Sequence, residues 1–173
     1  VHDSEHRATN PSIVTARQLN GKELSYNNIL DLDAALSMVR LLPDPSVVVL
    51  KHNNPCGAAS NASICVATRL AMDGDPVSAF GSILGFNRVV DVASAQYLCN
   101  PGLFVEAIVA PDFEPAALEM LLSVPKWKSN VRLMTNLGLP VAACSRCSAS
   151  RSNVESPPAC LMKLAISAAA AGE

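Results

Sequence analysis

Residues 47–57 read VVVLKHNNPCG, and this stretch decides how the fold is interpreted. Its four leading apolar residues, mostly β-branched, predict a buried β-strand over residues 46–51. The strand delivers Lys51 and His52 at its carboxyl end, which is where ligands of open α/β sheets lie. Side chains alternate along a strand, so these two residues reach one ligand only if the extended path breaks at about Lys51. Residues 53–55, Asn-Asn-Pro, favour such a break. The competing interpretation is a strand that simply ends in solvent.

The segment before this strand has helical periodicity. Asn27 or Asn28 is expected to cap a helix that ends near Leu42, before Pro43 and Pro45. The apolar face of that helix is predicted to comprise Ile29, Leu32, Ala35, Leu36 and Val39.

The segment after this strand alternates between helical and extended patterns. Helices are predicted over residues 61–73, from Asp91 to about residue 98, and from Pro115 onward. Strands are predicted over residues 82–86, 103–110 and 131–134. Strands separated by helices indicate an α/β fold in which helices cover the sheet.

Composition narrows the functional classes. The chain has 173 residues, of which 50% are apolar, so it can build one domain core, with a tail in addition. Its net charge of −2 gives no electrostatic case for binding nucleic acid, which normally needs a basic patch. No apolar run reaches the roughly 18 residues of a membrane span, and the polar start favours a cytosolic protein. We expect a weakly structured lead-in at 1–15, a domain at 16–135 and a divergent tail at 136–173 that is rich in alanine, serine and cysteine.

The six cysteines are irregularly spaced, and reduced structural thiols are expected rather than a disulfide framework. Cys144 and Cys147 form a Cys-x-x-Cys pair with Cys160 nearby, but no histidine follows at a usable spacing. The His-x-Glu and Pro-Cys-x-x-Cys pattern of zinc deaminases is also absent. No metal site is expected. Phosphate-binding and dinucleotide-binding glycine motifs are likewise absent from the sequence.

Four blocks, in this order, carry a family resemblance. They are QLNGKELSYNN at 18–28, KHNNPCG at 51–57, DPVSAFG at 75–81 and FVEAIVAPDF at 104–113. From about Ala16 to about Met134 the chain resembles the formyltransferase domain of the AICAR transformylase/IMP cyclohydrolase family. The resemblance implies a layered α-β-α fold similar to that of cytidine deaminase, without the zinc. It also implies formyl transfer from the co-substrate 10-formyltetrahydrofolate to AICAR in purine (IMP) biosynthesis, by a homodimer with active sites at its interface.

The resemblance assigns roles to individual residues. The matching His and Lys are catalytic in the family, so His52 is expected to act as the base and Lys51 to supply electrostatic or acid assistance. Which of the two moves which proton stays open. Positions that match the substrate and folate pocket are Asn54, Val77, Phe80, Gly81 and Glu106. For Phe80 the alternative is a plain core residue, and for Glu106 it is an outward-facing strand residue.

Much of the family protein has no counterpart here. Nothing resembles its cyclohydrolase domain, the Arg-Tyr-Gly-x-Asn-Pro-His-Gln stretch, or the second half of the formyltransferase. Residues 136–173 are interpreted either as a flexible tail or, as we favour, as the product of an interrupted coding sequence. Two functional classes therefore remain: a formyltransferase fragment that keeps the catalytic pair, and an inactive α/β remnant that binds a partner or self-associates.

Overall fold

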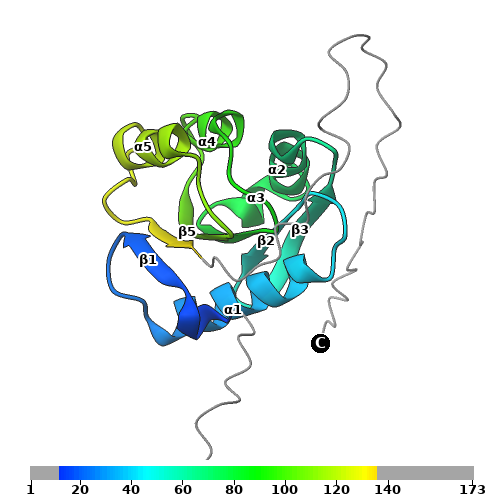
Figure 1. Cartoon of the computed structure of the whole chain (residues 1–173), viewed down its shortest axis with the longest axis horizontal. Coiled ribbons are helices and arrows are strands. Elements are labelled where there is room, and N and C mark those ends of the chain that lie inside the picture. The colour runs from blue at the N-terminus through cyan, green and yellow to red at the C-terminus, as the bar shows by residue number, and fades with distance from the viewer. Residues whose placement is uncertain (1–11, 136–173) are drawn as a thin grey trace, which may run out of the picture.

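A computed structural model describes residues 12–135 of the chain; the expected tail and its cysteine pair lie outside this range. One mixed sheet forms the centre of the domain (Figure 1). Its strands follow the order β1-β6-β5-β4-β2-β3. They are β1 (Arg17–Asn20), β2 (Ser46–Lys51), β3 (Asn54–Ser60), β4 (Ser82–Phe86), β5 (Val105–Ala110) and β6 (Arg132–Thr135). β4, β5 and β6 run parallel, and the other neighbouring pairs are antiparallel.

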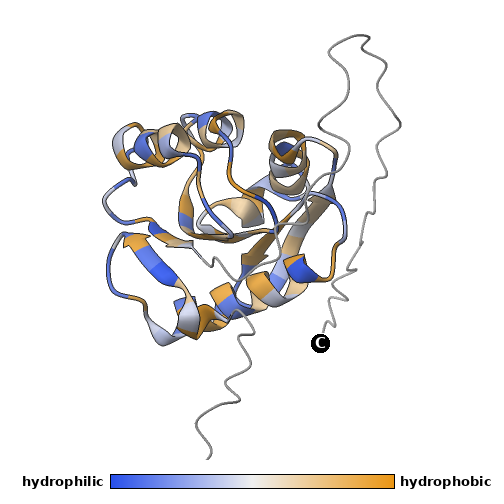
Figure 2. Cartoon of the chain, in the orientation of Figure 1, coloured by the Kyte–Doolittle hydropathy of each residue, from blue (hydrophilic) through white to orange (hydrophobic). Residues whose placement is uncertain are grey.

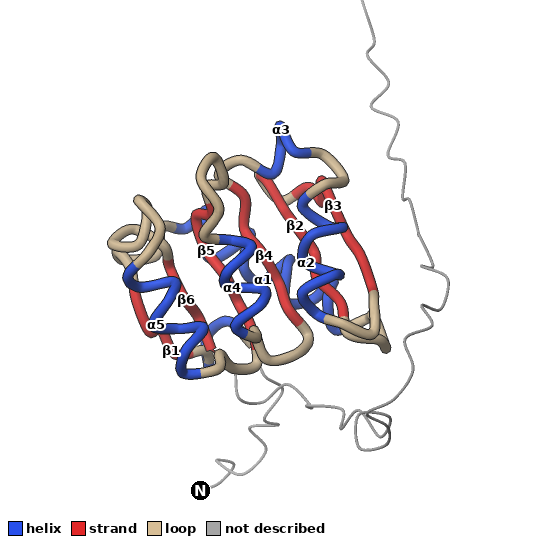
Figure 3. Tube along the Cα trace, turned by 90° about the horizontal axis from the view of Figure 1, so that it is seen from above, coloured by secondary structure: helices blue, strands red, loops and turns tan. Residues whose placement is uncertain are grey.

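Helices cover both faces of this sheet, which makes three layers (Figure 3). The short helix η1 (Ile13–Thr15) and α1 (Tyr26–Arg40) pack on one face. The other face carries α2 (Ile64–Met72), α4 (Val92–Leu98) and α5 (Pro115–Ser123), and the short α3 (Pro76–Ala79) lies at one end of β2 and β3. The expected layered α/β fold is confirmed. Its relation to cytidine deaminase stays a prediction.

Two hydrophobic cores lie between these layers, one on each face of the sheet. Along β2 the residues alternate strictly: Val47 and Val49 face α2, while Val48 and Leu50 face α1. All four are buried because helices cover both faces, which explains why this strand reads as a continuous apolar run. Figure 2 shows apolar residues concentrated on the strands between the helical layers.

The beginning of α1 differs from its prediction. Ser25, and not Asn27 or Asn28, caps the helix: its Oγ accepts a hydrogen bond from the amide of Asn28. Asn28 occupies the third helical position and completes a capping box through its own side chain. Ile29 is 38% exposed, so its assignment to the apolar face was wrong, whereas Leu32, Ala35, Leu36 and Val39 are buried as predicted.

The remaining predicted elements are present within a few residues, and four elements were missed. The predicted helix over 61–73 begins at Ile64, after the cap Ser63. The elements that were not predicted are η1, β1, β3 and the four-residue α3. β3 reads NPCGAAS, which is poor in β-branched residues and contains proline. It forms because it pairs with β2 at the edge of the sheet, where proline is tolerated.

The strand directions correct the expectation that the site lies at the carboxyl ends of parallel strands. Lys51 lies at the carboxyl end of β2, but β2 is antiparallel to β4. The same edge of the sheet therefore carries the amino ends of β4, β5 and β6, and not their carboxyl ends. Below, the Lys51 edge means this side of the sheet, which is formed by the carboxyl end of β2 and the amino ends of β4, β5 and β6.

Candidate active site

The Lys51 edge is built around a two-residue turn between β2 and β3. Lys51 pairs with Asn54, and His52 and Asn53 between them have φ values of 51° and 65°. Two consecutive positive φ angles are the signature of a type I′ turn, whose twist matches that of the flanking strands. The extended path thus breaks directly after Lys51, as predicted, and the turn residues are His52 and Asn53 rather than residues 53–55. His52 and Asn53 are both exposed.

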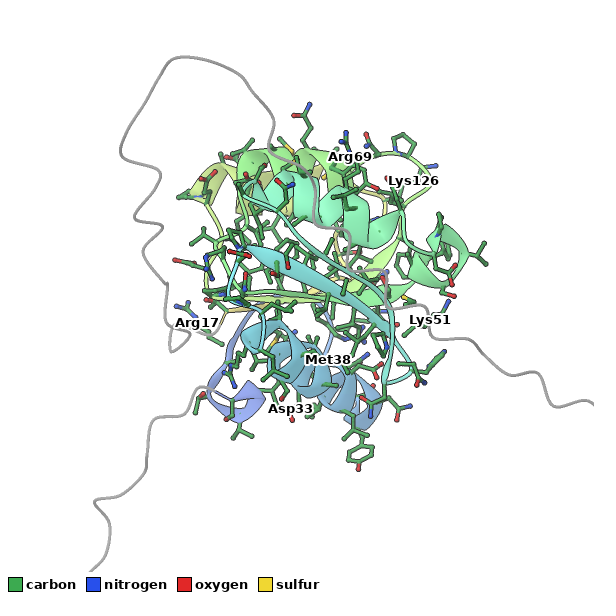
Figure 4. The ribbon with its side chains drawn as sticks, turned by 90° about the vertical axis from the view of Figure 1, so that its right-hand side faces the viewer. Arg17, Asp33, Met38, Lys51, Arg69 and Lys126 are labelled. Carbon is green, nitrogen blue, oxygen red and sulfur yellow. The ribbon has the colours of Figure 1, made fainter. Side chains whose placement is uncertain are left out.

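Lys51 is half-buried and lies at the end of the sheet, between the helical layers (Figure 4). Its Nζ donates a hydrogen bond to the carbonyl oxygen of Phe80, 2.9 Å away. Phe80 ends the short helix α3, which Asp75 caps by accepting a hydrogen bond from the amide of Ser78 at 3.0 Å. The end of α3 thus presents a backbone carbonyl to the lysine.

Charge at this end of the sheet is balanced locally. Hydrogen bonds from Ser78 to the carboxyl group of Asp75 lower the pKa of that group, and the Lys51 ammonium lowers it further. Burial raises the pKa of the neighbouring Cys56 thiol, assisted by the charge of Asp75 and opposed by Lys51. The raised pKa keeps Cys56 protonated at neutral pH, as expected of a structural thiol. Cys65 and Cys99 are free thiols whose pKa values burial also raises.

The predicted pocket residues at 77–81 lie beside Lys51. Phe80 is 56% exposed and its ring packs against that of Phe104, with centroids 5.5 Å apart. Gly81 has φ +76° and donates its amide to the carbonyl of Phe104 at 2.8 Å. Val77 projects into solvent with 83% of its surface exposed. Phe80 is therefore no core residue, since more than half of its surface is available to a ligand.

Glu106 lies apart from Lys51. β4 separates its strand β5 from β2, and Glu106 is an extra residue in the β4–β5 pairing, a β-bulge. Bulges redirect side chains. Here Oε1 accepts hydrogen bonds from Asn28 of α1 at 2.8 Å and from Arg132 of β6 at 3.3 Å. The carboxylate is paired on the α1 face of the sheet, and its side chain remains 39% exposed.

Sequence reasoning missed three side chains that organise this edge. Arg132 pairs with Glu106, and Asp31 accepts a hydrogen bond from the amide of Asn53. Asn28 was interpreted only as a cap. Asn28 and Asp31 lie three residues apart on α1, so they share one face of the helix and both point at the sheet edge. The three-residue spacing of Asn28 and Asp31 is visible in the sequence, but it indicates contacts with the sheet only once the packing of α1 is known.

Within residues 12–135, no group of three or more His, Cys, Asp or Glu side chains could hold a metal ion. No helix among the same residues has the length and apolar character needed to cross a bilayer.

Comparison with known proteins assigns the family. The model of the AICARFT/IMPCHase bienzyme family matches residues 2–148. The bifunctional purine biosynthesis protein PurH of Rhodopirellula baltica is 59% identical over 132 residues, which cover 76% of this chain and 25% of that protein. PurH of Myxococcus xanthus is 48% identical over 132 residues, covering 75% of this chain and 24% of its own length.

A solved structure, Acinetobacter baumannii RibD, form 1, aligns with 60% of this chain and 35% of its own, at a TM-score of 0.46 and 14% identity. The chain spans about a quarter of the length of the curated relatives it matches. Because the family model covers most of its residues, the chain belongs to the AICARFT/IMPCHase bienzyme family.

Proposed function

We propose that the chain serves purine biosynthesis as part of an AICAR formyltransferase, with Lys51 and His52 as its catalytic pair. The observation that carries this proposal is the Lys51 edge. In a member of this family, a strand ends in a half-buried ammonium, and the next residue exposes an imidazole on a tight turn. The partly exposed Phe80 lies beside Lys51.

The proposed reaction moves a formyl group from 10-formyltetrahydrofolate to the amine of AICAR. The amine nitrogen attacks the formyl carbon, its proton leaves to a base, and the bond from the formyl carbon to the folate nitrogen breaks as that nitrogen gains a proton. The amine is a poor nucleophile because its lone pair is delocalised, so a base matters. An imidazole is suited to this at neutral pH, and we assign the base to His52.

Lys51 has the donors that the developing oxyanion needs. An ammonium group carries three N–H donors, and the carbonyl of Phe80 takes one of them. The other two are available to the formyl oxygen or to the departing folate nitrogen. Asn54, Val77, Phe80, Gly81 and Glu106 are proposed to contact AICAR or folate. No metal takes part in this proposal, and a cytosolic homodimer is the assembly we expect.

A second function is suggested by exposed apolar side chains. Tyr26, Val77 and Phe80 are 73%, 83% and 56% exposed. An inactive α/β remnant that self-associates through side chains of this kind would use this exposure without catalysis.

The test is a formyl-transfer assay on the purified chain with AICAR and 10-formyltetrahydrofolate, beside Lys51→Ala and His52→Ala. Each variant should lose about 100-fold or more of the turnover, because positioned acid–base groups contribute roughly 10²–10⁴-fold. Lys126→Ala is the control: this lysine is exposed and lies away from Lys51 (Figure 4), so turnover should not change. Absence of turnover in a folded wild-type chain would overturn the activity. Self-association in light scattering, without binding of either substrate, would then support the remnant.

A further inference from the structure

The peptide group that joins His52 to Asn53 is held at both of its ends. Its carbonyl, which belongs to His52, accepts a hydrogen bond from the side-chain amide of Asn54 at 2.9 Å. Its N–H, which belongs to Asn53, donates to Oδ1 of Asp31 at 2.6 Å. The second contact is short, as hydrogen bonds to carboxylates are. One of the two partners is local, whereas the other comes from α1, 22 residues away in sequence.

The hairpin does not supply this second partner by itself. In a two-residue turn, the closing hydrogen bonds are made by the flanking pair, here Lys51 and Asn54. The N–H of the second turn residue points out of the hairpin. Without Asp31 it would face water, and nothing would connect the turn to α1 at this point.

Fixing this peptide group constrains where the imidazole of His52 can lie. With the peptide plane held, ψ of His52 sets the direction of the Cα–Cβ bond from which the imidazole projects. The imidazole itself makes no hydrogen bond to any residue in the range 12–135, and His52 is exposed. Within the described residues, the constraint on its position therefore comes from the backbone. A backbone with two consecutive positive φ angles at non-glycine residues persists only where its surroundings hold it.

We propose that Asp31 is a positioning residue for His52: through the amide of Asn53 it holds the turn, and so aims the imidazole at the site beside Lys51. This inference rests on the proposed function, in which His52 is the base. It adds a side chain of α1 to the machinery of the Lys51 edge. Asp31 touches no substrate in this proposal and acts through the backbone alone.

The test compares Asp31→Ala with Asp31→Asn in the full chain. Alanine removes the acceptor, whereas asparagine keeps an Oδ1 that can accept from Asn53. Asp33→Ala is the matched control, because Asp33 is an exposed carboxylate two residues away on the same helix (Figure 4). Hydrogen exchange and ¹⁵N relaxation of the His52 and Asn53 amides report on the turn, and formyl-transfer kinetics report on its consequence.

If the inference holds, Asp31→Ala exposes the Asn53 amide to exchange and mobilises both turn amides, while the rest of the sheet keeps its protection. Its kcat falls about tenfold or more with KM for AICAR changed less than about threefold, since misplacing a reacting group by about 1 Å costs up to roughly 100-fold. Asp31→Asn restores most of kcat, and Asp33→Ala behaves as the wild type.

Two results would overturn the inference. In the first, the turn amides of Asp31→Ala exchange and relax like those of the wild type. In the second, they loosen but kcat falls no more than in Asp33→Ala. A wild-type chain without turnover would refute the proposed function, and in that case the amide measurements alone decide whether Asp31 holds the turn.

Discussion

Tyr97 on α4 donates a hydrogen bond from its phenolic oxygen to Oδ1 of Asp73, 3.1 Å away. Burial, followed by the charge of Asp73 and this hydrogen bond, raises the pKa of Tyr97 to about 12. The contact links the end of α2 to α4 on the face of the sheet opposite α1. A single side-chain pair therefore makes the stability of this layer depend on pH.

The direction of that dependence follows from proton binding. Between pH 10 and pH 12 the folded state keeps the phenol proton that an unfolded tyrosine loses. The contribution of Tyr97 to the free energy of unfolding is complete below about pH 10 and is lost as pH rises through about 12. Because Tyr97 is partly exposed, solvent screening limits this loss to about 1 kcal/mol.

Urea denaturation at pH 9 and above pH 11 would measure this loss, with Tyr97→Phe as the matched variant. The variant has no phenol proton, so its free energy of unfolding should fall less over the same interval. Equal losses in the two proteins would contradict the assignment.

At the scale of elements, the edge strand β3 depends on its contact with α2. Gly57 lies where the backbone of β3 passes over α2: a Cβ built on it would collide with the carbonyl oxygen of Ala71. Gly57 needs no unusual backbone angle, so the requirement is for space alone. The small residues of β3 thus allow its backbone to approach the backbone of α2 closely, and no large side chains pack between them at this point.

Gly57→Ala should therefore lower the free energy of unfolding by about 1–3 kcal/mol, the usual cost of forcing extra volume into a packed contact. Thermal and urea unfolding would measure it. Ala58→Val is the control: Ala58 is the next residue of the strand, is exposed, and should tolerate a β-branched side chain to within about 0.5 kcal/mol. A neutral Gly57→Ala would show that α2 can move away from β3.

At the scale of the whole molecule, the two cores share one sheet. Leu36 of α1 is fully buried on one face. Trp127, the single tryptophan of the chain, is buried on the other face and donates its indole N–H to the carbonyl of Leu103 at 2.9 Å. Adjacent residues of the same strands contribute to both cores, so neither core can be lost without disturbing the strands of the other.

Leu36→Ala should cost about 2–5 kcal/mol, as removal of a buried leucine side chain usually does. The unfolding midpoint should fall by the same amount whether it is followed by tryptophan fluorescence or by far-ultraviolet circular dichroism, although Trp127 lies across the sheet from Leu36. Separate midpoints for the two probes would show that the α1 layer unfolds by itself.

Several elements were predictable because their signals are local. The uninterrupted apolar run of β2 predicted a strand with the observed bounds, Ser46–Lys51. Asp91 was expected to cap a helix, and it caps α4 by accepting a hydrogen bond from the amide of Ser94. The four ordered blocks also predicted the family, which the comparison confirmed over residues 2–148. The roles of Lys51 and His52, and the boundaries at residues 15 and 135, stay predictions.

The features that only the tertiary structure decided are contacts between residues that lie far apart in the sequence. By itself the sequence determined the apolar periodicity, most of the helices and strands, and the motif at residues 51–57, because each depends on neighbouring residues. β3 became a strand only by pairing with β2, and Glu106 acquired its partner Asn28 across 78 residues. Asp31 reached the His52 turn only because α1 packs along that edge of the sheet. Such contacts depend on how packed layers are placed in space, which no local pattern of side chains encodes.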